Sequence, residues 1–409
     1  MHILFFTDNF PPEVNAPASR TYEHSRAWVK SGEEVTIITC APNFPKGKVF
    51  SGYKNKLWQT EVVDGIKVIR VWTYIAANEG FFKRILDYVS YMISSIVASF
   101  FVKRVDVIIG TSPQFFTVCG TYLVSLLKRK PWIFELRDIW PESIKALGAI
   151  EDSKVIRALQ KIEVFLYKKA NAIICVTNSF KEYLIKKGID SEKIFVITNG
   201  VDLSRFVPKK KNDYLIEKYN LRDFFVFGYI GTHGLAHHLE TVIDAAWQIE
   251  TKYPELKIKF IFLGDGACKK QLQSYAIKLS LKNVIFIDTV DKDKVVNFWS
   301  IIDVSITHLR NTQLFNSVIP SKIFESMAMG VPILHGVQGE SANIIEGEDV
   351  GLCFASEDSE DLTSKILILA SDIEAISKKR INCINAAKKY DRLNLAKNFL
   401  SIFKERINT

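Results

Sequence analysis

Residues 320–332 read PSKIFESMAMGVP, and this stretch predicts a short helix that connects a loop to a buried strand. Pro320 suits the first position of a helix, because its fixed φ fits there and its missing N–H is not needed. Gly330 suits the left-handed position after the last turn, and Pro332 prevents the helix from continuing. We therefore expect a helix of about nine or ten residues, followed by a strand over 332–334.

The amino end of this expected helix collects polar groups. Ser321 and Lys322 lie in its first turn, and Glu325 lies one turn further on. A helix amino end carries about half a positive charge and free N–H groups, and the two together bind anions. Glu325 is placed to accept hydrogen bonds from a sugar diol. The same residues also suit an ordinary surface helix with a Lys–Glu ion pair, so the rest of the chain has to decide between the two interpretations.

Length and charge indicate a large globular protein with an acidic partner. The chain has 409 residues, 48% of them hydrophobic, and a net charge of +9. This length suits about two or three domains. The charge suits a nucleotide, an anionic lipid surface or a nucleic acid. Nucleic acid is disfavoured, because no basic recognition element with interleaved aromatic residues is visible.

The six cysteines indicate a reduced, cytosolic protein without structural zinc. They are far apart, no Cys-x-x-Cys pair or His cluster accompanies them, and several lie in apolar, strand-like runs. Residues 1–6, MHILFF, suit a strand rather than a signal peptide. The cysteines are Cys40, Cys119, Cys175, Cys268, Cys353 and Cys383.

Apolar strand-like runs alternate with amphipathic helical patterns, and this alternation predicts parallel sheets. A charged stretch at 201–220 divides them into two series, so we expect two tandem doubly wound α/β domains, 1–203 and 222–390. A linker at 204–221 and a C-terminal helix at 391–409, packing back on the first domain, complete this division. Ligands bind such sheets at the carboxyl ends of the strands, and the cleft between the domains is the default site. The expected strands are Ile3–Phe6, Val35–Thr39, Val105–Ile109, Trp132–Leu136, Ile173–Val176, Ile194–Ile197, Val226–Ile230, Ile258–Leu263, Val284–Ile287, Val304–Thr307 and Ile333–His335.

Two strand ends of the second series run into glycine turns. Residues 229–234 read YIGTHG and residues 263–266 read LGDG, so the backbone there can approach a phosphate closely. Each turn alone is also a common strand-to-helix connection. The chain has no P-loop lysine pattern, and no G-x-G-x-x-G follows the first strand. Both a nucleotide triphosphatase and a dinucleotide dehydrogenase are therefore disfavoured.

Four segments in this order resemble the retaining GT-B glycosyltransferases of family 4. They are Asn199–Asp202, Tyr229–Thr232, Leu263–Gly266 and 320–332, so the resemblance covers nearly the whole chain. Residues 135–143, ELRDIWPES, are similar to a subgroup that acts in bacterial surface polysaccharide assembly and includes L-fucosamine transferases.

The resemblance implies a nucleotide-diphosphate sugar in the C-terminal domain and an acceptor in the N-terminal domain. It assigns the ribose hydroxyls to Glu325. It assigns the diphosphate to Ser321, Lys322 and the backbone of Gly231 and Thr232. It also implies that the main chain near Val290 meets the base.

The chain departs from the family pattern around the donor sugar and the diphosphate. Ser317 stands where the family often has a Glu that reaches the sugar, which suits a 6-deoxy or N-acetylated amino sugar such as N-acetyl-L-fucosamine. The segment Thr232–His238 lacks the Arg and Lys that commonly bind the diphosphate. Arg310 or Arg137 can replace that charge.

The expected mechanism depends on positive charge at the leaving diphosphate. Lys322 is the first candidate for this role, because such charge is usually the largest catalytic contribution. In the retaining family the acceptor is thought to attack from the face of departure, while a diphosphate oxygen takes its proton. Arg137 and Asp138, where many members have His-Asp, either orient the substrates as catalytic residues or form a structural pair. We expect no metal and no cofactor besides the UDP-sugar substrate.

The acceptor-binding candidates are expected mainly in the long loop Thr7–Arg20, which is rich in Pro and small residues. In the family this loop closes over the diphosphate and the acceptor. Asn15, Arg20 and Trp140 are the acceptor-binding candidates, although Arg20 also suits a plain position in the first turn of a helix.

Residues 81–104 form a strongly apolar segment that is bracketed by Lys-Arg pairs. Asp87 and several serines make it a poor membrane span. It suits either an interfacial helix on anionic lipid or a buried core helix. Lys209–Lys211 suits a solvated linker rather than a lipid contact.

The sequence thus predicts a retaining glycosyltransferase of bacterial O-antigen or capsule synthesis, peripheral at the inner face of the cytoplasmic membrane. Its donor is expected to be a UDP-sugar and its acceptor a polyprenyl-diphosphate-linked saccharide. Two alternatives stay open: a UDP-sugar 2-epimerase on the same fold, and a non-catalytic protein that binds sugar nucleotides.

Overall fold

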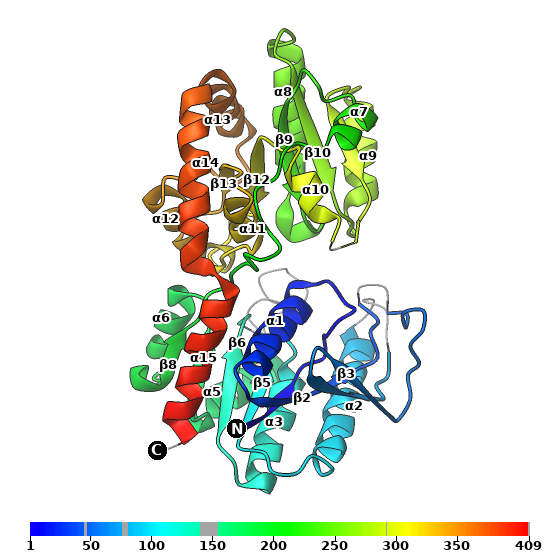
Figure 1. Cartoon of the computed structure of the whole chain (residues 1–409), viewed down its shortest axis with the longest axis vertical. Coiled ribbons are helices and arrows are strands. Elements are labelled where there is room, and N and C mark those ends of the chain that lie inside the picture. Colours follow the sequence, from blue (N-terminus) through cyan, green and yellow to red (C-terminus); the bar gives the residue numbers. More distant parts are fainter. Residues whose placement is uncertain (45–46, 76–80, 140–153, 292, 408–409) are drawn as a thin grey trace. The chain divides into compact units, whose positions relative to one another are not determined.

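The structure is a computed structural model that describes residues 1–44, 47–75, 81–139, 154–291 and 293–407. The chain divides into two compact units (Figure 1). The first comprises Met1–Thr198 and Arg392–Thr409, and the second comprises Asn199–Asp391. The boundary lies a few residues before the expected one, and the stretch 204–221 belongs to the second unit rather than to a free linker.

The first unit is built on an eight-stranded sheet with the order β3-β4-β2-β1-β5-β6-β7-β8. All neighbouring strands are parallel except β3, which pairs with β4 in the antiparallel direction. The strands are β1 (His2–Phe6), β2 (Glu34–Cys40), β3 (Trp58–Val63), β4 (Ile66–Val71), β5 (Val107–Thr111), β6 (Trp132–Leu136), β7 (Ala172–Cys175) and β8 (Ile194–Val196). The six strands expected in this half are confirmed.

Six helices and a short 3-10 turn accompany this sheet among the described residues. They are α1 (Ala16–Lys30), α2 (Phe81–Ser99), α3 (Phe115–Lys128), α5 (Lys154–Lys169), α6 (Asn178–Lys186), η1 (Ser191–Lys193) and α15 (Arg392–Ile407). The last helix packs on α1 (Figure 1). The Trp28 indole donates to the carbonyl of Ala396 at 2.8 Å, and the rings of Phe399 and Phe403 contact the same indole edge-on. The C-terminal helix is therefore part of the core of the first unit.

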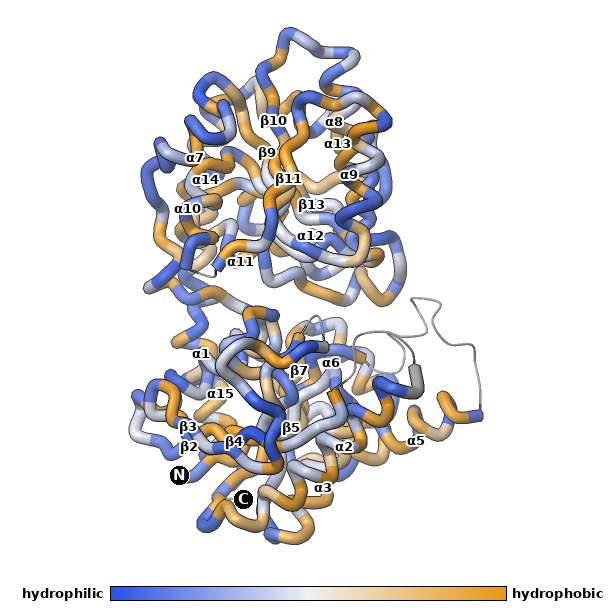
Figure 2. Tube along the Cα trace, turned by 90° about the vertical axis from the view of Figure 1, so that its right-hand side faces the viewer, coloured by the Kyte–Doolittle hydropathy of each residue, from blue (hydrophilic) through white to orange (hydrophobic). Residues whose placement is uncertain are grey.

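The second unit has a six-stranded, fully parallel sheet with the order β11-β10-β9-β12-β13-β14. The strands are β9 (Phe225–Ile230), β10 (Ile258–Leu263), β11 (Val284–Ile287), β12 (Val304–His308), β13 (Ile333–Gly336) and β14 (Gly351–Cys353). The five expected strands are confirmed, and β14 adds a short edge. Separate apolar clusters fill the two faces of the sheet, and hydrophobic residues follow its strands (Figure 2).

The helices of the second unit lie on both faces of its sheet (Figure 1). One face carries α11 against α14, and the other carries α8 against α13. The helices are α7 (Asp213–Lys218), η2 (Leu235–His237), α8 (Glu240–Lys252), α9 (Lys269–Lys278), α10 (Val295–Trp299), η3 (Phe315–Ser317), α11 (Lys322–Ala328), α12 (Glu340–Gly347), α13 (Ser359–Ser371), α14 (Ile373–Ala387) and η4 (Lys388–Tyr390). Both units are thus doubly wound α/β folds, as expected.

The helix in the stretch 320–332 is shorter than expected. It spans Lys322–Ala328, and Pro320 lies before it rather than at its first position. The amides of Ile323 and Phe324 bond to the carbonyls three residues back, at 3.2 and 3.3 Å, so the chain enters through a tight turn before the α-helical pattern begins. Gly330 has a φ of +68°, so the expected left-handed exit is confirmed.

Candidate functional site

Lys322 and Glu325 lie beside each other at the amino end of α11. The Lys322 ammonium is 2.9 Å from Oε2 of Glu325, and the buried indole of Trp299 donates to the same oxygen at 3.4 Å. The Glu325 side chain is 16% exposed and that of Lys322 is 37% exposed. The pair therefore presents one carboxylate and one cation to solvent, and Trp299 is a positioning partner that the sequence did not reveal.

The two serines near α11 differ in their availability. Ser321 is the N-cap residue of α11, but its side chain makes no capping hydrogen bond. The hydroxyl of Ser317 donates to the carbonyl of Leu314 at 2.6 Å within the turn η3. Ser321 is thus available to a ligand beside Lys322, whereas Ser317 stabilises its own turn.

The glycine turns after β9 and β10 support each other. Gly264 has a φ of +147°, and a Cβ there would lie 1.9 Å from the carbonyl oxygen of Gly231. Gly266 has a φ of +159°, and a Cβ there would lie 2.4 Å from the carbonyl oxygen of His233. The amide of His233 donates to the carbonyl of Asp265 at 2.9 Å. The second turn therefore needs its glycines to pack against the first, and it holds Gly231 and Thr232 in place.

A buried lysine, which the sequence did not reveal, fixes the same region. The Lys269 side chain is 7% exposed, and its ammonium donates to the carbonyls of Gly264 at 2.7 Å and Ile287 at 3.2 Å. It also pairs with Asp288 at 2.6 Å, which lowers the pKa of that carboxyl. The only sequence signal was a lysine in the first turn of the helix that follows a glycine turn.

The expected donor residues all lie in the second unit, in segments that follow the strands β9, β11 and β12. Because the carboxyl ends of parallel strands share one edge, these segments gather at that edge of the sheet. Val290 lies after β11 and packs against the core. Arg310 is exposed after β12 and donates to the carbonyl of Leu235 in the loop after β9. The topology therefore places the segments of the predicted set at one edge of the second sheet; the set is Gly231, Thr232, Val290, Arg310, Ser317, Ser321, Lys322 and Glu325.

In the first unit, Arg20 is a buried structural residue. Its Nε lies 2.8 Å from Oε1 of Glu135, and the two side chains are 2% and 1% exposed. Its Nη1 and Nη2 atoms donate to the carbonyls of Thr198 at 2.7 Å and Ile197 at 2.9 Å. Arg20 therefore links α1 to β6 and to the end of the β8 segment. This geometry favours the plain helix position over acceptor contact.

Asn15 and Glu13 organise the loop after β1. The Asn15 side chain caps α1 by accepting from the amide of Ala18 at 2.9 Å. The Glu13 carboxylate is buried and accepts from the amides of Asn43 and Phe44, each at 2.8 Å. Burial raises the pKa of Glu13 to about 7. Both side chains therefore hold the loop, and Glu13 is a residue that the sequence pattern did not single out.

Arg137 is a buried cation of the first unit. Its Nε and Nη1 atoms are buried and have no hydrogen-bond partner among the residues that the structure describes. Burial lowers the pKa of Arg137 to about 10 and raises the pKa of Asp8, which lies within its electrostatic reach. The backbone amides of Arg137 and Asp138 donate to the hydroxyl of Ser112 at 2.8 and 3.3 Å. The third acceptor candidate, Trp140, lies outside the described residues.

Metal ligands do not group in the described part of the chain. No set of three His, Cys, Asp or Glu side chains there is placed to hold a metal ion. The six cysteines are all free, and four of them are buried.

Each unit matches a glycosyltransferase family. Residues 18–205 match the family described as Glycosyltransferase Family 4, and residues 212–390 match Glycosyl transferases group 1. A probable glycosyltransferase, WbjE of Pseudomonas aeruginosa, is 23% identical over 61% of this chain and 62% of its own length. The UDP-Gal:alpha-D-GlcNAc-diphosphoundecaprenol alpha-1,3-galactosyltransferase of Escherichia coli is 26% identical over 57% of this chain and 61% of its own length. The chain thus matches less than two thirds of the length of these relatives.

Solved structures show the same fold over nearly the whole chain. Sucrose-phosphate synthase from Thermosynechococcus elongatus superposes with a TM-score of 0.79 at 14% identity, covering 99% of this chain and 98% of that chain. HepE of Anabaena in complex with UDP-glucose gives 0.75 at 15% identity, covering 99% and 100%. WaaG, a glycosyltransferase involved in lipopolysaccharide biosynthesis, gives 0.70 at 12% identity, covering 98% and 99%. The fold is therefore GT-B.

Proposed function

We propose that this GT-B chain, whose units match two glycosyltransferase families, is a nucleotide-sugar-dependent glycosyltransferase that moves a sugar from a UDP-sugar to a lipid-diphosphate-linked saccharide. The observation that carries the proposal is the Lys322–Glu325 pair beside Ser321 on the carboxyl edge of the second sheet. The Glu325 carboxylate can accept hydrogen bonds from sugar hydroxyls, and the Lys322 ammonium can bind a phosphate. The fold is that of HepE, whose solved complexes contain UDP and UDP-glucose.

In the proposed complex, Glu325 accepts hydrogen bonds from the ribose hydroxyls. Ser321, Lys322 and the backbone at Gly231 and Thr232 surround the diphosphate. The main chain near Val290 contacts the base. Trp299 keeps the Glu325 carboxylate oriented through its indole N–H.

The proposed reaction breaks the bond between the sugar and the diphosphate. Negative charge then develops on the leaving phosphate, and preorganised cations there lower the barrier. Lys322 supplies that charge, and a diphosphate oxygen accepts the proton of the attacking hydroxyl, with retention at the sugar. Ser317 gives the sugar pocket no carboxylate, which suits a 6-deoxy or N-acetylated amino sugar such as N-acetyl-L-fucosamine.

The acceptor proposal follows from the relative in Escherichia coli that acts on a diphosphoundecaprenol-linked sugar. An exposed surface of the first unit suits the lipid membrane that holds such an acceptor. It joins the ends of α2 and α3 through exposed apolar side chains and a basic groove. We call it the basic apolar patch; its residues are Phe100, Phe101, Leu126, Leu127, Lys103, Arg104, Lys128 and Lys130.

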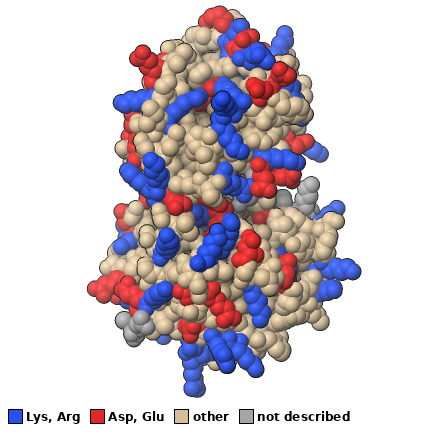
Figure 3. All heavy atoms as spheres, viewed as in Figure 1, with Lys and Arg blue, Asp and Glu red and all other residues tan. Residues whose placement is uncertain are grey.

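This patch favours an anionic lipid surface as its partner. Phe100 is 57% exposed and Phe101 is 67% exposed, and Figure 3 shows Lys and Arg side chains grouped below α3 at the lower end of the first unit. Each cation near such a surface contributes about 1 kcal/mol. No helix in the described ranges is long and apolar enough to cross a bilayer. From the basic apolar patch and the lipid-linked substrate of the Escherichia coli relative, we propose peripheral binding at the inner face of the cytoplasmic membrane, in O-antigen or capsule synthesis.

The decisive experiment is a screen of nucleotide-sugars by thermal shift and by turnover, with and without membrane-extracted lipid-diphosphate saccharide. We expect a UDP-sugar to raise the Tm, and turnover to require the acceptor. Conversion of the UDP-sugar without any acceptor would instead identify a 2-epimerase. Binding without turnover across the acceptor panel would identify a non-catalytic binding protein, and no stabilisation by any nucleoside diphosphate would refute the donor site.

Membrane binding is tested by co-sedimentation with vesicles of phosphatidylglycerol or phosphatidylcholine. We expect binding to the anionic vesicles and a clear loss in the double variant Phe100→Ser and Phe101→Ser. Ile277→Ser is the control, because Ile277 is 77% exposed and belongs to the second unit rather than to the basic apolar patch. Equal binding by both variants would remove the patch from the proposal.

A further inference from the structure

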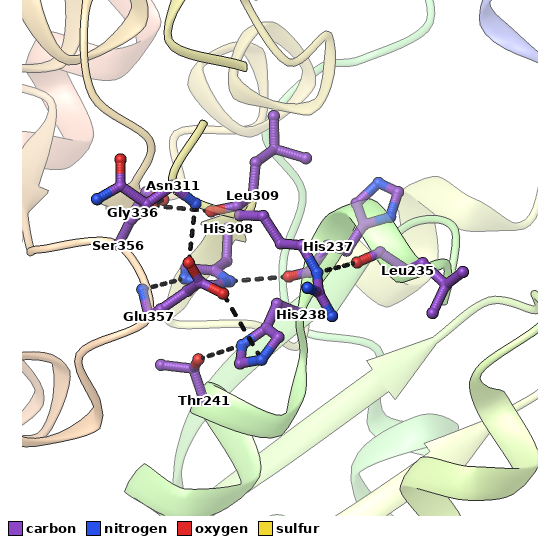
Figure 4. A network of polar contacts seen from close by, with 11 residues as sticks. Leu235, His237, His238, Thr241, His308, Leu309, Asn311, Gly336, Ser356 and Glu357 are labelled. Atoms are coloured by element: carbon purple, nitrogen blue, oxygen red, sulfur yellow. Dashed lines mark hydrogen bonds and ion pairs between the residues drawn. The ribbon is translucent and has the colours of Figure 1, made fainter. Parts of the chain in front are cut away.

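The loop after β9 is joined to the end of β12 by consecutive hydrogen bonds. Nε of Arg310 donates to the carbonyl of Leu235 at 2.8 Å, and the amide of Arg310 donates to the carbonyl of Ala236 at 2.9 Å. Nδ1 of His308 bonds to the carbonyl of His237 at 2.8 Å (Figure 4). We call residues 232–238 the diphosphate loop and residues 308–310 the β12 exit. Three successive carbonyls of the loop thus point at one short segment.

His308 is locked in one neutral tautomer by its two partners. The amide of Glu357 donates to Nε2 at 2.9 Å, so Nε2 has no proton and Nδ1 carries the hydrogen. Burial lowers the pKa of His308 to about 4, in agreement with a neutral ring. The ring also stacks on Phe354, with 5.7 Å between centroids and an interplanar angle of 7°. His308 is therefore a fixed hydrogen-bond donor to the carbonyl of His237.

Glu357 lies beside the far end of the diphosphate loop. Its Oε1 lies 3.6 Å from Nε2 of His238, and its Oε2 accepts from the amide of Asn311 at 3.0 Å. Nδ1 of His238 bonds to the hydroxyl of Thr241 at 2.9 Å (Figure 4). The β12 exit therefore holds the loop, and Thr241 holds His238 beside Glu357.

This arrangement prepares the loop for an anion. The carbonyls of residues 235–237, which would repel a phosphate, are directed to the β12 exit. The amides of Gly234, Leu235 and Ala236 have no hydrogen-bond acceptor within the described residues, so they are free to donate. The loop itself contains no Arg or Lys.

Arg310 brings a cation to this loop from another strand. Its side chain is exposed, and Nε alone among its guanidinium nitrogens has a hydrogen-bond partner in the described part of the chain. The bond from Nε to the carbonyl of Leu235 orients the guanidinium, while its two terminal nitrogens stay available. A guanidinium offers two parallel donors, and this geometry suits phosphate oxygens.

We propose that the β12 exit replaces the cations that the diphosphate loop lacks: Arg310 binds the diphosphate of the donor, and His308 is a positioning residue that holds the loop beneath it. The inference rests on the proposed donor site. It adds one more ligand for the leaving diphosphate. This ligand follows β12, whereas the others come from the glycine turns and α11.

The test compares uridine with UDP by calorimetry, because only UDP presents the diphosphate. In Arg310→Gln we expect the affinity for UDP to fall about 10- to 100-fold, as for a lost charge-assisted hydrogen bond, and the affinity for uridine to stay unchanged. Arg310→Lys keeps the charge but loses the bond to Leu235, so it should recover part of the affinity. Arg222→Gln is the control, because Arg222 is 72% exposed and pairs only with Glu217 within the described residues.

His308 is tested with two variants that separate its bonds. His308→Asn keeps a donor near the Nδ1 position and should retain most UDP affinity. His308→Phe keeps the stacking on Phe354 but removes the donor, so it should weaken UDP binding and speed hydrogen exchange at residues 235–238. Equal effects of the two variants on UDP affinity would refute the positioning role.

The outcomes separate this inference from the proposed function. If the wild-type protein prefers UDP to uridine and Arg310→Gln keeps the same preference, Arg310 is not a diphosphate ligand and the glycosyltransferase proposal stands. If the wild-type protein binds no nucleoside diphosphate, the donor site itself is refuted. Because Arg310 is exposed, its variants test the proposal even where His308→Phe fails to fold.

Discussion

Mild acid should destabilise the second unit through its buried histidines. Burial lowers the pKa of His233 and His308 to about 4 and that of His335 to about 3. In the unfolded chain each imidazole has a pKa of about 6.5. At a pH between the folded-state and the unfolded-state pKa values, the imidazoles bind protons in the unfolded state but not in the folded state. The free energy of unfolding therefore stays constant above about pH 7 and falls as the pH drops from 6.5 towards 4.

The magnitude follows from these values. At pH 5.5 the protonated form of each unfolded imidazole exceeds the neutral form about ten to one. Each histidine therefore lowers the free energy of unfolding by about 1.4 kcal/mol relative to pH 7.5. Three such groups give about 4 kcal/mol, a large share of a typical 5–15 kcal/mol. The carboxyls of Asp288 and Asp349 have lowered pKa values, so they lose their contribution only at more acid pH.

Denaturant titration of the full chain at pH 7.5, 6.5 and 5.5, followed by hydrogen exchange of second-unit peptides, measures this loss. His335→Gln removes one titrating ring and can still reach the hydroxyl of Ser341, which His335 contacts at 2.8 Å. We expect it to reduce the acid-dependent loss by about 1.4 kcal/mol. His2→Gln, in the first unit, should leave the second unit's pH dependence unchanged. A flat response between pH 7.5 and 5.5, or an unchanged loss in His335→Gln, would show that these rings do not titrate as described.

Four further predictions concern single side chains. Lys322→Ala should lower kcat by about 10²–10³-fold with a smaller change in KM. Steady-state kinetics with a saturating acceptor measures this loss, and an unaffected kcat would contradict the role of Lys322. Glu325→Ala should weaken UDP binding by about 10- to 100-fold in calorimetry, and unaltered affinity would contradict its ribose contact. Gly264→Ala should cost about 1–3 kcal/mol from backbone strain at a φ of +147°, and more because the new Cβ would lie 1.9 Å from the carbonyl oxygen of Gly231; an unchanged Tm would show that the turn relaxes. Trp28→Ala should cost about 3–5 kcal/mol of first-unit stability, measured by denaturant unfolding, and a loss below 1 kcal/mol would mean that α15 packs independently of it.

The sequence predicted both sheets because their central strands are short, continuous apolar runs, a pattern typical of parallel strands that are buried on both faces. The antiparallel hairpin of β3 and β4 was missed, since β3 is half exposed and mixes polar with apolar residues. Its turn did carry a signal. Asp64 and Gly65 both have positive φ, and an Asp-Gly pair between two short strands is typical of such a hairpin.

The candidate site was predictable where its residues are close in sequence. Ser321, Lys322 and Glu325 lie at the start of one helix, so their spacing in the sequence already predicted that they are neighbours in space. Trp299 and Lys269 were not predictable, because their roles arise from contacts between segments that are distant in the chain. Arg20 was misleading because a charged residue near the start of a helix is usually exposed, whereas the fold buries this one against Glu135.

The path of the chain through its two units has a consequence for biosynthesis. The chain leaves the first unit after Thr198 and returns only at Arg392. During synthesis on the ribosome the whole second unit therefore emerges, and can fold, while the first unit still exposes the indole of Trp28. The carbonyl of Ala396 that receives this indole is made only after the whole second unit. Until then the first unit is an incomplete domain that needs protection from aggregation, and any premature stop before residue 392 leaves it so permanently.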